Sequence, residues 1–80
     1  MNLEHHRKDP KTELQEYLQG KKVDLPGYEI VNINGDPHNQ LFTVDCVVTG
    51  LGKKTTGQGS SRRKAEQDAA SRMLAHLKDE

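Results

Sequence analysis

The sequence has one cysteine, Cys46, and no apolar stretch that approaches the length of a membrane span. A single thiol excludes an internal disulfide and fits a reducing compartment. Because Cys46 stands in a run of alternating apolar residues, we interpret it as a small core residue. No signal-peptide pattern is present. These features predict a soluble, cytoplasmic chain with no membrane partner.

The sequence also lacks the residue clusters that metal sites and hydrolytic centres need. Within the part expected to fold, no cysteine or histidine stands at metal-ligand spacing from any of the histidines, which are His5, His6, His38 and His76. The acids are scattered, with no group that could hold two Mg²⁺ ions; they include Glu13, Glu16, Asp24, Glu29, Asp36 and Asp45. We therefore expect no metal, no cofactor, no small-molecule ligand and no catalytic residue in this chain.

Net charge is absent as well, since 12 basic residues balance 12 acidic ones. Taken alone, this balance argues against a nucleic-acid binder. The distribution argues the other way, because no acid occurs between residues 47 and 61. Five cations lie between residues 53 and 64: Lys53, Lys54, Arg62, Arg63 and Lys64. A neutral total can therefore hide a basic face.

The length of 80 residues predicts one small domain with an economical core. Residues 1–8 show no apolar periodicity, and we expect them to be a disordered linker or a cloning remnant, with the domain at residues 9–78. Asp9 and Pro10 predict a helix start, and the helix should run to about residue 19, with Gly20 as its stop. Its inward side chains should be Leu14, Tyr17 and Leu18.

Three strands and a second helix should follow. The patterns predict strands at residues 28–34, 40–48 and 53–58, a turn-rich loop at 35–39, a short turn at 50–52 and a helix at 61–77. Tyr28 and Ile30 should face one side of the first strand, with Val31 and Ile33 on the other. Phe42, Val44 and Cys46 should join the core together with the stripe of the last helix, which is Ala65, Ala69, Ala70, Met73, Leu74 and Leu77.

This order predicts an α+β fold of the form α-β-β-β-α. Strands joined by short connections form an antiparallel meander. Two helices with apolar stripes must then cover the same face of the three-stranded antiparallel sheet, since only that arrangement buries both stripes with the alternating strand residues. We therefore expect both helices to pack on one face.

Two polar features can carry function. Residues 57–70 read G-Q-G-S-S-R-R-K-A-E-Q-D-A-A, which predicts a helix whose positive end is crowded by Arg62, Arg63 and Lys64. That crowding is unfavourable unless an anion neutralises it, and nucleic-acid phosphate is the anion we favour. The first helix carries a polar, mostly uncharged face formed by Thr12, Gln15, Glu16 and Gln19. Either feature could instead be an ordinary solvated helix surface.

Four stretches in order carry a family resemblance: L-P-G-Y at 25–28, G-D-P-H at 35–38, F-x-V-x-C at 42–46 and G-x-G-S-S-R-R-K-A-E-x-x-A-A at 57–70. Together they resemble a double-stranded-RNA-binding domain. More narrowly, D-P-K-T-E-L-Q-E-Y-L-Q-G at 9–20 and G-S-S-R-R-K-A-E-Q at 59–67 resemble the C-terminal domain of bacterial ribonuclease III. The resemblance covers nearly everything from residue 9 onward.

The resemblance implies three contact regions on duplex RNA. Thr12, Gln15 and Glu16 would enter one minor groove, where Glu16 could accept a hydrogen bond only from a ribose hydroxyl. The loop of Gly35, Asp36, Pro37 and His38 would enter the next. The phosphates between them would meet the start of the last helix, formed by Gly59, Ser60, Ser61, Arg62, Arg63 and Lys64. By their charge, Lys53 and Lys54 could add phosphate contacts. Glu66 departs from the family, because many relatives carry a cation there.

The resemblance also implies that this chain is the binding part of an endoribonuclease. A missing catalytic domain with Mg²⁺ would cleave duplex RNA in rRNA and mRNA processing. The isolated domain should be a monomer and the parent a homodimer. Two alternatives stay open: a protein-protein interaction module on the same fold, and a small free-standing enzyme, for which the sequence offers no catalytic constellation.

Overall fold

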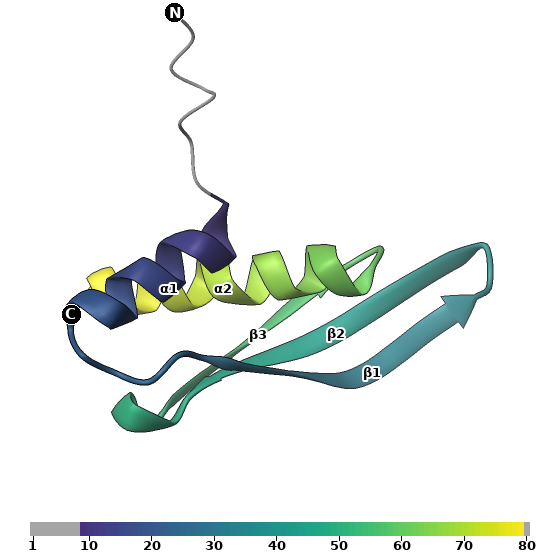
Figure 1. The fold of residues 1–80 in the computed structure, drawn as a ribbon. Helices are drawn as coiled ribbons and strands as arrows, with labels where there is room; N and C mark the ends of the chain where they lie inside the picture. The colour runs from purple at the N-terminus through teal and green to yellow at the C-terminus, as the bar shows by residue number, and fades with distance from the viewer. Residues whose placement is uncertain (1–8, 80) are drawn as a thin grey trace, which may run out of the picture.

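The computed structural model describes residues 9–79, and these form a layer of helices above a layer of strands (Figure 1). The expected linker at residues 1–8 lies outside the described residues. The elements are α1 (Pro10–Gly20), β1 (Gly27–Asp36), β2 (Asn39–Val48), a single 3-10 turn η2 (Thr49–Leu51), β3 (Lys53–Gly59) and α2 (Arg62–Lys78). The predicted α-β-β-β-α order is confirmed.

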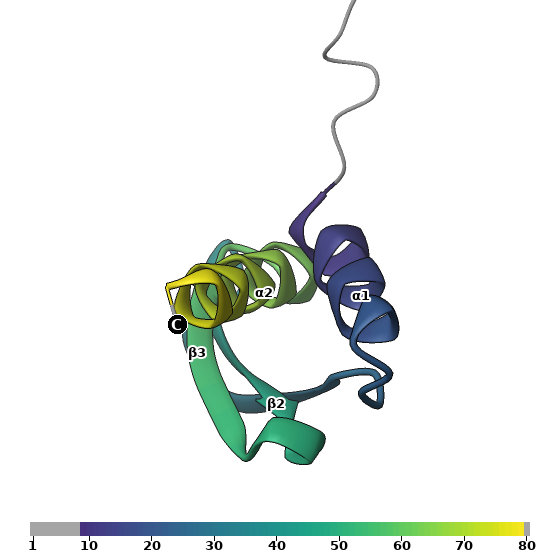
Figure 2. The ribbon, with the colours of Figure 1, turned by 90° about the vertical axis from the view of Figure 1, so that its left-hand side faces the viewer.

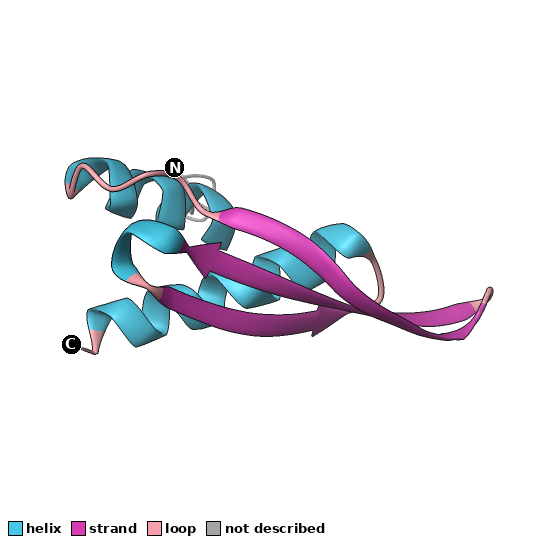
Figure 3. Ribbon diagram, turned by 90° about the horizontal axis from the view of Figure 1, so that it is seen from below, coloured by secondary structure: helices cyan, strands magenta, loops and turns pink. Residues whose placement is uncertain are grey.

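The three strands form one antiparallel sheet in the order β1-β2-β3. Tyr28 of β1 pairs with Cys46 of β2, and Val44 of β2 pairs with Gly57 of β3. Both helices cover the same face of this sheet, as the end-on view in Figure 2 shows. Seen from below in Figure 3, the strands leave their other face open. The predicted packing of two helices on one face is therefore confirmed.

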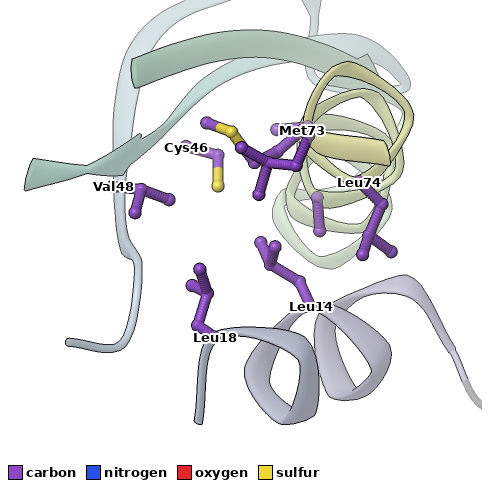
Figure 4. Packing of buried hydrophobic residues seen from close by; sticks show 9 residues of the cluster. Leu14, Leu18, Cys46, Val48, Met73 and Leu74 are labelled. Carbon is purple, nitrogen blue, oxygen red and sulfur yellow. The ribbon is translucent and has the colours of Figure 1, made fainter. Parts of the chain in front are cut away.

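The core lies between this covered face and the two helices (Figure 4). Leu14 and Leu18 of α1 meet Cys46 and Val48 of β2, and all four are fully buried. The helix α2 contributes its predicted stripe of Ala65, Ala69, Ala70, Met73, Leu74 and Leu77. Burial of these apolar side chains is what holds the helices on the sheet.

Phe42 was expected in the core and is only half-buried. It pairs with Gly59, the last residue of β3, so the sheet narrows to two strands beyond it. The β1–β2 hairpin then projects past the N-terminus of α2 (Figure 1). Because no helix covers the projecting part, Phe42 lies at the edge of the core.

A bulge in β1 corrects the predicted facing of Ile33. Ile30 pairs with Val44 and Ile33 with Phe42, so the register shifts at Val31 between them. The extra residue returns Ile33 to the face of Ile30, because side chains alternate along a strand and one inserted residue reverses the alternation. Both Val31 and Ile33 are exposed, and Ile33 lies at the point where the sheet narrows to two strands.

The end of α1 also differs from the expectation that Gly20 stops the helix. Gly20 is the last helical residue, and the left-handed residue is Lys22, with φ 59°. The Val23 amide donates to the Leu18 carbonyl at 2.9 Å, and the Lys22 amide donates to the Gln19 carbonyl at 3.0 Å. These two bonds form the Schellman motif, which usually has glycine at the left-handed position.

Lys22→Gly should therefore stabilise the domain. A left-handed lysine is strained by its Cβ, and glycine removes that strain while adding some freedom to the unfolded chain. We expect the free energy of unfolding to rise by about 0.5–1 kcal/mol. Urea unfolding followed by circular dichroism measures it, with Lys21→Gly as the matched control, since Lys21 has φ −97°. If both substitutions destabilise equally, the strain does not exist.

The backbones of β3 and α2 lie unusually close together. A Cβ built on Gly57 would lie 2.6 Å from the Ala69 Cα and 2.7 Å from the Ala65 carbonyl oxygen. The Thr55 hydroxyl donates to the Ala69 carbonyl at 2.8 Å. The close approach of the two backbones therefore needs both glycines on β3 and alanines on α2. It also fixes where α2 begins over the sheet.

Candidate nucleic-acid interface

The first of the three expected regions is the N-terminus of α2. The helix begins at Arg62, and Ser61 is its cap, because the Ser61 hydroxyl accepts from the Lys64 amide at 3.2 Å. Arg62, Arg63 and Lys64 are exposed, and the first turn of α2 contains no acid. Free helix amides and three cations thus occupy one end of α2, which favours an anion there. Gly59 and Ser60 lead directly into this turn.

The second region is the polar face of α1. Asp9 caps the helix, since its Oδ1 accepts from the Thr12 amide at 2.8 Å, and this bond lowers the pKa of the Asp9 carboxyl. Thr12, Gln15 and Glu16 are exposed, whereas Leu14 between them is buried. The predicted division of α1 into an inward apolar stripe and an outward polar face is therefore confirmed.

A cleft of about 380 Å³ joins these two regions. Its walls come from α1, from the segment that enters β1 and from α2: Asp9, Lys11, Thr12, Gln15, Leu25, Pro26, Tyr28, Arg63 and Gln67. Two expected contact residues of α1, Thr12 and Gln15, therefore border the same cleft as Arg63 of α2. Residues more than forty positions apart in the sequence are brought together at one surface.

The third region is the tip of the β1–β2 hairpin, where the structure shortens the expected loop. Gly35, Asp36 and Asn39 belong to the strands, so that only Pro37 and His38 form the turn. Asp36 Oδ1 accepts from the His38 amide at 3.0 Å. Gly35 has φ 92°, and a Cβ at this position would clash with the Asn39 carbonyl oxygen. These contacts fix the turn and leave Pro37 and His38 exposed.

The hairpin places this tip at a distance from the other two regions. Pairing between β2 and β3 ends at Phe42. The hairpin continues from Phe42 for three more residues to Asn39, which is about 10 Å at about 3.4 Å per residue. Figure 1 shows the hairpin rising toward the helix side, so that α1, the start of α2 and the hairpin tip follow one another along the molecule. A ligand that met all three would have to be long.

The five cations that are close in sequence do not form one patch. Lys53 and Lys54 begin β3, whereas Arg62–Lys64 follow its end, about 20 Å away along the strand. Lys54 Nζ lies 3.8 Å from Asp45 Oδ2, and Lys53 Nζ lies 3.5 Å from His76 Nε2. The structure therefore separates these two lysines from the start of α2.

Glu66 was not expected to be buried, yet it is only 9% exposed. Lys11 Nζ donates to its Oε1 at 2.6 Å, and Arg62 Nε donates to its Oε2 at 3.0 Å. Burial would raise the pKa of the Glu66 carboxyl, but the hydrogen bonds and charges of Lys11 and Arg62 outweigh burial and lower it. Glu66 thus links α1 to the first turn of α2.

Acid should weaken the fold through these carboxyls. Glu66 and Asp68 both have lowered pKa values, so each stabilises the fold above its ordinary pKa and loses that contribution as the pH falls through its folded-state value. We expect the free energy of unfolding to decrease once the pH is lower than about 4.5. Glu66→Gln should be less stable by about 2 kcal/mol at neutral pH and should converge with the unmodified chain in acid.

Urea unfolding at a series of pH values checks this expectation. Lys22→Gly serves as the control, because it should shift the whole stability curve without changing its shape. Parallel curves for Glu66→Gln and the unmodified chain would show that Glu66 does not contribute to the pH dependence.

Neither a metal centre nor a membrane segment is seen in residues 9–79. No three His, Cys, Asp or Glu side chains in this range are grouped to hold a metal ion. No helix in the same range is long and apolar enough to cross a membrane. Cys46 is fully buried, and burial raises the pKa of its thiol, as expected of a core residue.

The fold and the three exposed regions define a small α+β domain with an extended polar surface on its helix side. Comparison with known families gives its class: the model of the double-stranded RNA binding motif matches residues 10–77. The chain belongs to this family.

Individual relatives narrow the comparison. The chain is 58% identical over 71 residues to a Ribonuclease 3 of Aliivibrio fischeri. The aligned residues cover 89% of this chain and 32% of that protein. A Ribonuclease 3 of Buchnera aphidicola is 53% identical over 77 residues, covering 96% and 34%. The chain thus spans about a third of the length of these curated relatives. Among solved structures, Arabidopsis HYL1 is similar, with a TM-score of 0.74, 36% identity and coverage of 89% of this chain and 99% of that one.

Proposed function

We propose that this chain binds double-stranded RNA by its shape. In this proposal Thr12, Gln15 and Glu16 enter one minor groove, the hairpin tip enters the next, and the start of α2 meets the phosphates across the major groove between them. The supporting observation is the cleft that places α1 polar residues beside Arg63, with the hairpin projecting beyond. Family membership supports the ligand class.

The side chains suit this division of tasks. Ribose hydroxyls can donate and accept, so the Thr12 hydroxyl and the Gln15 carboxamide can bond to them in either sense. A Glu16 carboxylate can only accept, and DNA lacks the hydroxyl that would donate to it. Arg63 and Lys64 bind phosphates, which supplies affinity without reading sequence. Duplex RNA should therefore bind more tightly than duplex DNA.

We further propose that the chain is the substrate-binding domain of a ribonuclease III. The matches to Ribonuclease 3 proteins, each covering about a third of the relative, support a longer parent. A separate catalytic domain with Mg²⁺ would cut the duplex in rRNA and mRNA processing in the cytoplasm. The isolated domain would be a monomer and the parent a homodimer.

A binding comparison tests the proposal. Fluorescence anisotropy with a labelled RNA duplex of about 16 base pairs, its DNA counterpart and one RNA strand should rank the RNA duplex first. Incubation of the same RNA duplex with the chain and Mg²⁺ should leave it intact. Equal binding of all three nucleic acids would contradict recognition by shape. Binding of none would favour a protein-interaction module on the same fold.

A further inference from the structure

The strongest unassigned feature is the cluster of Lys11, Arg62 and Glu66. The acid is covered and the cations are not: the Glu66 side chain is 11% exposed, against 35% for Lys11 and 61% for Arg62. Each cation contacts a different oxygen of the carboxylate, at 2.6 Å from Lys11 and 3.0 Å from Arg62. The three side chains together carry one positive charge, whereas the two cations alone would carry two.

The cluster lies beneath the surface that should meet phosphate. Arg62 is the first residue of α2, and Lys11 immediately precedes Thr12 on α1. Lys11 also lines the cleft that joins Thr12 and Gln15 to Arg63. Its Nζ sits 4.8 Å from the centre of the Tyr28 ring, which further restricts where it can point. The Glu66 carboxylate therefore lies between two cations, one at the first residue of α2 and one in the cleft beside Thr12.

We infer that Glu66 is a positioning residue that limits phosphate attraction: it holds Arg62 and Lys11 in place and cancels one unit of their charge. The inference rests on the proposed binding of duplex RNA. Arg62 Nε is engaged by Glu66, so a phosphate must either share Arg62 or displace the carboxylate. Attraction to any polyanion is thereby reduced, while the minor-groove contacts that read shape are unaffected.

The consequence is a specific change in salt dependence. Each phosphate neutralised adds about −0.9 to the log-log slope of affinity against salt for duplex DNA. Glu66→Gln keeps the size of the side chain and removes the charge, so the slope should become steeper by up to about one unit. The affinity for RNA duplexes and the affinity for DNA duplexes should rise by similar factors, because phosphate is common to both. A merely structural residue would not change this slope.

The experiment measures affinity of the unmodified chain and Glu66→Gln for RNA and DNA duplexes over a range of salt. We expect Glu66→Gln to bind RNA about fivefold more tightly at low salt. That advantage should shrink by about threefold between about 50 and 200 mM salt. If Glu66→Gln folds poorly, the same comparison is made in the Lys22→Gly background, which changes a distant turn.

Asp68→Asn is the matched control. Asp68 lies on the same helix and also pairs with an arginine four residues away, since Arg72 Nε lies 3.1 Å from its Oδ2. Unlike Glu66, it accepts a hydrogen bond from the Gln58 amide of β3. This variant makes the same change in net charge and should leave the slope unchanged. Weaker binding by Glu66→Gln with an unchanged slope, or an equal slope change in Asp68→Asn, would overturn the inference. Failure of the unmodified chain to bind RNA would refute the proposed function instead.

Discussion

Replacing Arg63 and Lys64 together by glutamine should weaken binding to an RNA duplex by about 30-fold at low salt. The log-log salt slope should become shallower by nearly two units, because two phosphate contacts are lost. The double variant retains Lys11 and Arg62 with their bonds to Glu66, so the Lys11 contact that links α1 to α2 stays intact. Stability should be unchanged or slightly higher, since cations at a helix N-terminus oppose the dipole.

The control for this prediction is Arg72→Gln with Lys78→Gln. Both cations are exposed on the later turns of α2, and their replacement removes the same total charge. Their ion pairs with Asp68 and Glu13 lie at the surface and should contribute little to stability. If this control loses as much affinity as the first variant, then net charge rather than the start of α2 governs binding.

Gly57→Ala should destabilise the domain by at least about 3 kcal/mol. The added Cβ would meet the Ala69 amide nitrogen at 2.2 Å and the Ala65 carbonyl oxygen at 2.7 Å, and both are backbone atoms that cannot rotate away. Helix α2 would have to leave the sheet to make room. Small domains have only a few kcal/mol of net stability, so much of the population should be unfolded at 37 °C.

Gly20→Ala provides the contrast. No atom lies within 4 Å of a Cβ built on Gly20, and the residue ends α1 in helical conformation. Alanine should stabilise the helix there by up to about 1 kcal/mol. Urea midpoints of the two variants should therefore move in opposite directions. A Gly57→Ala midpoint close to that of the unmodified chain would contradict the close approach of β3 and α2.

Much of the fold could be predicted because its signals are local. Asp9 and Pro10 start α1, and alternation from Phe42 to Val48 marks β2. Helical spacing of small and apolar residues marks the buried stripe of α2. The pairing of glycines on β3 with alanines on α2 was also visible as composition, since both remove side chains where backbones must approach.

The departures arise where geometry is set by contacts across the fold. The bulge at Val31 follows from the pairing of β1 with β2, which no spacing within β1 reveals. The left-handed residue at the end of α1 is Lys22 rather than the nearby glycine, because the Leu18 carbonyl is satisfied by Val23. Phe42 follows the apolar alternation of β2, but it lies at the edge of the core, where α2 no longer covers the sheet.

The sequence names the candidate site residues, and the structure adds contacts around them of which the sequence shows only a part. Spacing of four between Arg62 and Glu66 indicates a helical ion pair, and this signal was available. The contact of Lys11 with Glu66 could not be read from the sequence, since the two residues are 55 positions apart. Lys11 supplies one of the two cation contacts to the Glu66 carboxylate, so the sequence shows only half of the cluster.

The same contacts explain how α2 tolerates its cationic start. Its first turn has no acid to offset Arg62, Arg63 and Lys64, and Glu66 follows one turn further on. Glu66 neutralises Arg62 from the covered side and leaves Arg63 and Lys64 exposed. An anionic ligand would complete the neutralisation of the helix start.

The most direct test is an amide NMR titration of the chain with a short RNA duplex. The account predicts shifts at Thr12, Gln15, Glu16, His38 and residues 60–64, with the open face of the sheet, around Asp45 and Thr56, silent. Shifts centred on that open face, with α1 and the hairpin tip unmoved, would contradict the account.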